Sequence, residues 1–140
     1  MSRMARLVVP GYPHHITQRG IRGFKTFFDP LDYMTYLQLL KDSNKTANVS
    51  VWAYCLMPNH VHLILVPEAC NGIAKLLRKA HSQYALRVNG ARGWKGHLWQ
   101  ERFYSTVMDE SHALAALRYV ELNPVRAGLC SKAEDWPWSS

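Results

Sequence analysis

The chain has 140 residues, 48% of them hydrophobic, which suits one domain around a single core. It carries 17 Lys and Arg against 10 Asp and Glu, so its formal charge is +7 and its pI is near 9.5, which predicts a polyanionic partner. No apolar run is long enough to span a membrane, and the N-terminal segment is interrupted too early for a signal peptide. Three scattered cysteines without C-x-x-C spacing fit a reducing cytoplasm better than a structural zinc site.

Turn signals and apolar periodicity divide the single expected domain, residues 1–140, into seven elements. The expected elements are strands at residues 14–20, 49–56, 60–66 and 98–107 and helices that begin near residues 30, 71 and 109. Asn71 is expected to cap the second helix, Asn89-Gly90 to stop it, and Asn123-Pro124 to end the third. The order βαββαβ plus a helix predicts an α+β fold with a ferredoxin-like or RRM-like antiparallel sheet, a fold that by itself decides no function.

Two histidines interrupt the apolar strand expected at residues 60–66. Because side chains alternate faces along a strand, His60 and His62 point the same way, while Val61 points to the opposite side. Burying an imidazole costs free energy unless the ring is hydrogen-bonded or binds a ligand. The pair is therefore either structural or able to share a metal ion.

The third helix offers a candidate nucleophile. Tyr119 and Asn123 lie one turn apart, beside small alanines, on a face distinct from the inward stripe of Leu114, Leu117 and Val120. Tyrosine hydroxyls are poor nucleophiles near neutral pH because their pKa is about 10, so attack on phosphorus needs charge nearby. A metal ion at the histidine pair would polarise the phosphate, and the amide oxygen of Asn123 would complete its ligand shell.

Four blocks are spread along nearly the whole chain: YPHHITQRG at residues 12–20, CLMPNHVHLIL at 55–65, WQERFY at 99–104 and RYVELNPVRAGL at 118–129. In this order they resemble the single-tyrosine HUH transposases of the IS200/IS605 type, and within them the REP-associated tyrosine transposases. The resemblance implies that His60 and His62 are the HUH metal ligands, that Tyr119 is the nucleophile, and that Asn123 is the third ligand. It also implies the ferredoxin-like core.

The reaction that this resemblance implies is cleavage and rejoining of single-stranded DNA. The tyrosine attacks a phosphodiester, which leaves a 5′-phosphotyrosine and a free 3′-hydroxyl, and another 3′-hydroxyl then rejoins the DNA. Bond energy is kept in the covalent link, so no nucleotide cofactor is required. Mg²⁺ or Mn²⁺ is the expected metal ion.

The expected DNA is an imperfect hairpin with a short recognition tetranucleotide beside its foot, such as a REP sequence or an insertion-sequence end, in the nucleoid of a bacterial cell. Insertion-sequence members act as homodimers that share their active sites, whereas REP-associated members can act as monomers, so both states stay open. The sequence stops inside a segment that family members often continue. A tail trimmed from about residue 130 and a naturally short tail are both compatible with it.

Basic residues near the strand ends and on the second helix are the expected contacts to the DNA backbone: Arg19, Arg22, Lys25, Arg78, Lys79 and Arg102. Arg126 either joins them or caps the preceding helix. The remaining tyrosines considered are expected to pack in the fold: Tyr33, Tyr36, Tyr54, Tyr84 and Tyr104. The alternative function is a noncatalytic single-stranded DNA or RNA binding module, which would bind but form no covalent adduct.

Overall fold

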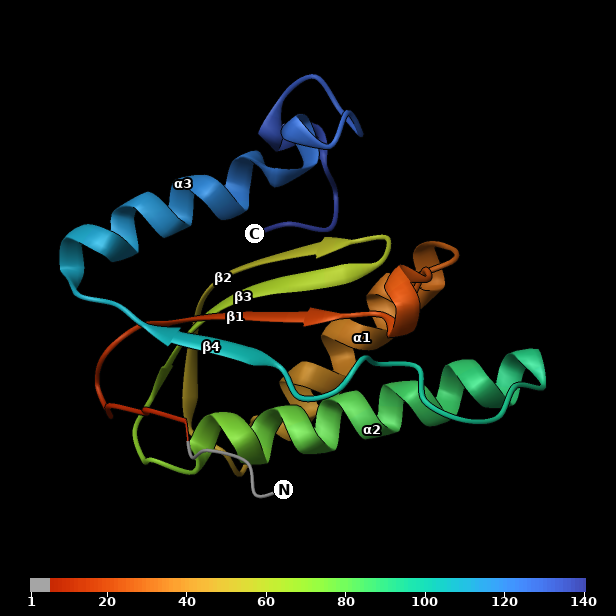
Figure 1. Ribbon diagram of the computed structural model, residues 1–140, viewed down its shortest axis with the longest axis horizontal. Coiled ribbons are helices and arrows are strands. Elements are labelled where there is room, and N and C mark those ends of the chain that lie inside the picture. The colour runs from red at the N-terminus through yellow and green to blue at the C-terminus, as the bar shows by residue number, and fades with distance from the viewer. Residues whose placement is uncertain (1–5) are drawn as a thin grey trace.

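The computed structural model describes residues 6–140, in which four strands form one antiparallel sheet with helices on both faces (Figure 1). In chain order the elements are β1 (His14–Arg19), η1 (Ile21–Gly23), α1 (Pro30–Ser43), β2 (Val49–Met57), β3 (His60–Pro67), α2 (Gly72–Arg92), β4 (Tyr104–Val107), α3 (Glu110–Arg126) and η2 (Ala133–Asp135). The strand order is β2-β3-β1-β4. This is a ferredoxin-like arrangement with an added C-terminal helix, so the expected fold class is confirmed.

The two faces of the sheet carry separate cores. Ile16, Leu63 and Leu65 pack against α1 and α2 in the main core. On the opposite face, Ile64 joins a smaller cluster with Val120 of α3. Because α3 packs chiefly over β2 and β3, much of β1 and β4 on this face is left open (Figure 1).

Helix α2 is longer than the sequence suggested. It continues past Asn89-Gly90 to Arg92 and ends where Gly93 adopts a left-handed conformation, with φ of 69°, so the expected stop was wrong. Asn71 takes the N-cap position, but its side chain makes no capping hydrogen bond. Neither α2 nor any other helix within residues 6–140 is long and apolar enough to cross a membrane.

The fourth strand is shorter than expected: residues 104–107 pair regularly with β1, whereas an isolated bridge joins Trp99 to Gly20 just beyond the end of β1. Residues 98–103 instead cross from α2 to the sheet, and Glu101 turns the chain with a φ of 46°. The Trp99 ring stacks on His81 of α2 at a centroid distance of 4.7 Å, and its Nε1 donates to the His81 carbonyl. The apolar residues of this segment, Leu98, Trp99 and Phe103, therefore pack in or against the main core.

Helix α3 begins as expected and ends later. The Asp109 side chain accepts a hydrogen bond from the backbone N–H of His112, which caps the first turn. The helix passes through Pro124 to Arg126, so the expected end at Asn123-Pro124 was wrong. Pro124 is buried, and the helix continues past it although the proline removes one intrahelical donor. Leu114 is 62% exposed, so its expected inward position was wrong.

The C-terminal tail folds back onto the edge of the sheet. Leu56 donates its backbone N–H to the Trp138 carbonyl, and Trp136 Nε1 donates to the Leu56 carbonyl. The Trp138 ring stacks on Tyr33 of α1 at 4.8 Å. The tail thus ties α3 to β2 and to the main core.

A close approach at Gly20, at the end of β1, gives a test of this packing. An added Cβ would lie 2.2 Å from the Phe24 carbonyl oxygen, so Gly20→Ala is expected to lower the free energy of unfolding by about 2–3 kcal/mol. The matched change Gly90→Ala meets no atom within 4 Å inside α2 and is expected to raise it by about 0.5–1 kcal/mol. Urea unfolding of both variants measures the difference. Effects of the same sign would contradict the described path of residues 20–24.

Candidate active site

The two histidines of β3 share the sheet face that α3 covers. Val61 between them lies in the main core, whereas His62 faces the same side as Cys55, its partner in the β2 register. The His60 and His62 rings meet edge to face, with centroids 4.9 Å apart. His62 is 3% exposed and His60 is half-buried. The strand alternation therefore places both rings side by side, as the sequence predicted.

Burial keeps both imidazoles neutral. It lowers the pKa of His60 to about 4, helped by the nearby Arg19 guanidinium. Burial also lowers the pKa of His62 to about 3, with smaller effects from His60, His15 and Arg19. A neutral imidazole has one nitrogen lone pair free for coordination, which is the form that binds metal ions.

Hydrogen bonds orient the two rings. His60 Nδ1 donates to Asn59 Oδ1 at 2.6 Å, which leaves its Nε2 as the lone-pair nitrogen. His62 Nδ1 lies 3.1 Å from His15 Nε2 and 3.5 Å from Thr17 Oγ1, both on β1. Partners of this kind fix the tautomer and orientation of metal-binding histidines.

The two histidines fit a divalent metal ion if an amide side chain supplies a third ligand. Two neutral, adjacent imidazoles supply two ligands. Within residues 6–140 there is no group of three or more His, Cys, Asp and Glu side chains that would complete the site. Asn123, half-buried on α3, is the side chain that the sequence offers as the third ligand.

Tyr119 projects from α3 toward the histidines. Its ring meets His62 edge to face with centroids 5.6 Å apart, and it lies 6.0 Å from the ring of His15. The side chain is 42% exposed, so a large substrate has access to it. The Arg126 guanidinium lies 5.5 Å from the centre of the Tyr119 ring, which places a cation beside the hydroxyl-bearing residue.

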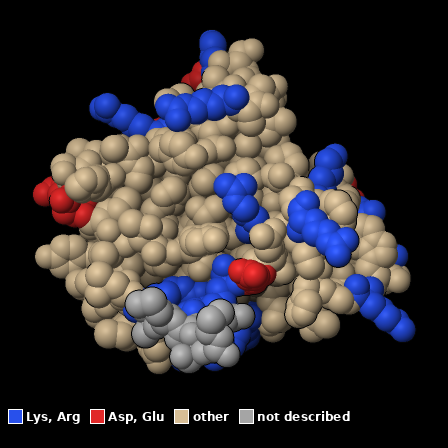
Figure 2. Space-filling view, viewed as in Figure 1, with Lys and Arg blue, Asp and Glu red and all other residues tan. Residues whose placement is uncertain are grey.

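The expected DNA contacts divide into two sets. Arg19, Arg22 and Lys25 are exposed at the end of β1 and in the following turn, near His60. Arg78 and Lys79 are exposed on α2, which packs on the opposite face of the sheet. Figure 2 shows Lys and Arg side chains along α3 and beside the open part of the sheet, with few acidic side chains on this side of the molecule.

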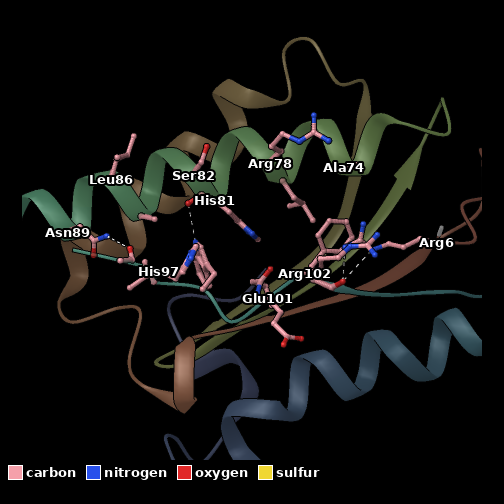
Figure 3. A pocket seen from close by; sticks show the side chains of 17 residues that line it. Arg6, Ala74, Arg78, His81, Ser82, Leu86, Asn89, His97, Glu101 and Arg102 are labelled. Atoms are coloured by element: carbon pink, nitrogen blue, oxygen red, sulfur yellow. Dashed lines mark hydrogen bonds between the residues drawn. The ribbon is translucent and has the colours of Figure 1, made fainter. Parts of the chain in front are cut away.

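A cavity of about 680 Å³ lies away from these rings, between α2 and residues 96–103 (Figure 3). Arg78 and Arg102 line it, together with the buried ring of His81, whose Nε2 is 2.8 Å from the Tyr36 hydroxyl. Burial lowers the pKa of His81 to about 3, so this ring is neutral. The lining of this cavity includes none of His15, His60, His62, Tyr119 and Asn123.

Two residues of the site face were missed by sequence reasoning. His15 touches both His62 and Tyr119, and only the β1–β3 register reveals this. Tyr104 was expected to pack in the fold but is 73% exposed, so that expectation was wrong, while Tyr33, Tyr36, Tyr54 and Tyr84 are buried or half-buried. The sequence did not show that Tyr104 lies on an edge strand, which is why its exposure was not predicted.

The chain combines a ferredoxin-like sheet, a His-x-His strand and a tyrosine on the helix that packs over that strand. The chain belongs to the family described as Transposase IS200 like, whose model matches residues 12–123. It is thus a member of the IS200-like transposases, with the tyrosine and both histidines inside the matched region.

Two curated relatives resemble the chain. A Haemophilus influenzae protein, named provisionally as a REP-associated tyrosine transposase, is 28% identical over 99 residues, which cover 63% of this chain and 56% of that protein. The REP-associated tyrosine transposase of Escherichia coli is 25% identical over 89 residues, which cover 63% of this chain and 52% of that protein. The chain therefore spans about half the length of the curated relatives it matches.

The solved structure of a REP-associated tyrosine transposase bound to a REP hairpin has the same fold. It matches with a TM-score of 0.81 and 22% sequence identity, and the match covers 99% of this chain and 82% of that chain. The fold assignment therefore extends over the whole described chain.

Proposed function

We propose that the protein cleaves and rejoins single-stranded DNA through a covalent bond to Tyr119. The observation that carries this proposal is the contact between the Tyr119 ring and His62, on a face of the sheet that is partly open and flanked by basic side chains. A tyrosine that served only packing would be expected to be buried. Tyr119 is instead 42% exposed, and it lies beside a buried, neutral imidazole.

His60, His62 and Asn123 would hold Mg²⁺ or Mn²⁺. When bound there, the ion supplies Lewis-acid stabilisation of charge on the phosphate and the leaving oxygen. His15 and Thr17 hold the His62 ring in place from β1, and Asn59 does the same for His60. The chain thus presents both imidazoles in fixed orientations before any ligand arrives.

The proposed reaction balances without a nucleotide cofactor. The Tyr119 oxygen attacks phosphorus and loses its proton to water, while the bond from phosphorus to the 3′ oxygen breaks and that oxygen takes up a proton. A second 3′-hydroxyl then attacks the phosphotyrosine, and Tyr119 regains its proton as the leaving group. Arg126, beside the Tyr119 ring, is placed to favour the negative charge that develops on the tyrosine oxygen.

The proposed substrate is an imperfect DNA hairpin with unpaired flanking nucleotides. The solved relative with the same fold is bound to a REP hairpin, and both curated relatives carry REP association in their names. The net charge of +7 suits a polyanion of this kind. The proposal is compatible with action on this DNA by a monomer or by a homodimer.

The test uses hairpin oligonucleotides labelled at either end and incubated with the protein and Mn²⁺ or Mg²⁺. We expect the label on the 3′ side of the cut to stay with the protein on a denaturing gel, and the label on the 5′ side to leave as a shorter strand. Tryptic digestion should place the DNA on peptide 119–126, which holds one tyrosine. Tight binding without any adduct across a broad pool of hairpins would instead favour a noncatalytic binding module.

A further inference from the structure

Tyr104 occupies an unusual position for a large aromatic side chain. It is the first residue of the edge strand β4, and its side chain is 73% exposed. In the β1–β4 register Tyr104 is opposite Thr17, and in the β1–β3 register Thr17 is opposite His62. The three residues therefore form one row across the sheet, on the face that carries the active-site rings.

The open part of this face lies between Tyr104 and the candidate site. Directly opposite residues on neighbouring strands point to the same face, and strands lie roughly 4.8 Å apart, so Tyr104 is roughly 10 Å from His62 along the row. Helix α3 packs chiefly over β2 and β3, which leaves the Tyr104 end of the row accessible. This separation suits the nucleotide next to a phosphate bound at His62.

Charged groups around Tyr104 complete a shallow hollow at the edge of the sheet. Its lining residues are Arg19, Gln100, Glu101, Arg102 and Tyr104. Arg19 is opposite His60 in the β1–β3 register, so the hollow adjoins the histidine pair. Two arginines against one glutamate give the hollow a net positive charge, and the Glu101 carboxylate and Gln100 amide offer acceptors for base amino groups.

We propose that Tyr104 and Arg19 form a nucleotide-binding subsite. The Tyr104 ring stacks against the base of the unpaired nucleotide that flanks the scissile phosphate, and the Arg19 guanidinium binds a neighbouring phosphate. Stacking on an exposed aromatic ring beside cations is how single strands are held without base pairing. The subsite rests on the proposed single-stranded DNA substrate and deepens it, because it assigns the position of the strand on the open half of the sheet.

The test measures DNA binding in a Tyr119→Phe background, so that no covalent product forms. Tyr104→Ala is expected to weaken binding of a hairpin with unpaired flanks about 10-fold, whereas Tyr104→Phe keeps the ring and stays within about 3-fold of the parent. Tyr12→Ala is the matched control, since Tyr12 is 52% exposed and lines a separate hollow with Trp52 and Leu114. It is expected to leave binding unchanged.

Abasic substitutions locate the stacked base. Removing that one base should weaken binding to the parent about 10-fold, but should add nothing to the loss in Tyr104→Ala, because both changes delete the same contact. Fully additive losses at every flanking position would overturn the subsite. A change in oligomeric state with unaltered DNA binding would also overturn it, since it would assign the Tyr104 edge to a protein contact.

These outcomes are independent of the cleavage reaction. If Tyr104 couples to one base while the unaltered protein forms no adduct, the subsite holds and the proposed catalytic function fails. If the unaltered protein forms the adduct and no base couples to Tyr104, the catalytic function holds and the subsite fails.

Discussion

Replacing Tyr119 with phenylalanine is expected to abolish covalent attachment of DNA, with a loss of more than about 10³-fold in adduct formation. The change removes the one oxygen that the proposed reaction joins to phosphorus. It keeps the ring that contacts His62 and His15 and lies beside Arg126, so the local packing should survive. A denaturing gel should therefore show no adduct for Tyr119→Phe. A native gel should show a DNA affinity within about 3-fold of that of the unaltered protein.

The control for Tyr119→Phe is the same change at Tyr12, an exposed tyrosine that lies outside the active site. Tyr12→Phe should form the adduct at the rate of the unaltered protein. Persistence of the adduct in Tyr119→Phe would assign the nucleophile to another residue and would remove the central residue of the proposal.

Loss of the His62 imidazole is expected to have the second-largest effect. In the unaltered protein, Mn²⁺ at 100 times its Kd should stabilise the fold by about 2.7 kcal/mol, a rise in Tm of roughly 8 °C for a domain of this size. His62→Ala and His60→Ala should each remove most of that rise, because one imidazole alone is a weak site. Adduct formation should fall by about 10²–10³-fold in the same variants.

The thermal shift is measured as the difference with and without Mn²⁺ for each variant, so that the cavity left by a buried ring does not enter the comparison. His62→Gln provides a second variant that keeps a polar side chain in the buried position. His112→Ala is the matched control, since this histidine is exposed at the start of α3 and contacts Asp109 instead. An unchanged metal-induced rise in both histidine variants would place the ion elsewhere.

Local sequence patterns predicted most of the fold, because strands and helices have characteristic apolar periodicities and their ends are marked by particular residues. Alternation in β3 fixed the common face of His60 and His62, and Asp29-Pro30 and Asp109 marked two helix starts. The errors fall where tertiary packing overrides such patterns. Leu98, Trp99 and Phe103 suggested a strand, but they pack against the main core, and an isolated bridge from Trp99 to Gly20 takes the place of regular pairing there.

The site was only partly accessible from the sequence for a related reason. The spacing of Tyr119 and Asn123 follows from helix geometry, but the approach of α3 to β3 depends on packing around Val120 and Ile64. His15 and Tyr104 become part of the site face only through the pairing of β1 with β3 and β4. Strand register between distant segments is not encoded in any one segment, so no local pattern identifies these two residues.

The tethering of α3 has a consequence for how the reaction depends on protein concentration. Residues 108 and 13 are joined by a backbone hydrogen bond before the helix, and Trp136 is anchored to Leu56 after it, so the tyrosine reaches histidines of its own chain. The encounter of these groups is intramolecular, and such encounters proceed at a high effective molarity that dilution does not change. If the monomer is the acting form, a cell holding only a few copies of the protein would obtain the same turnover from each copy as a cell holding many.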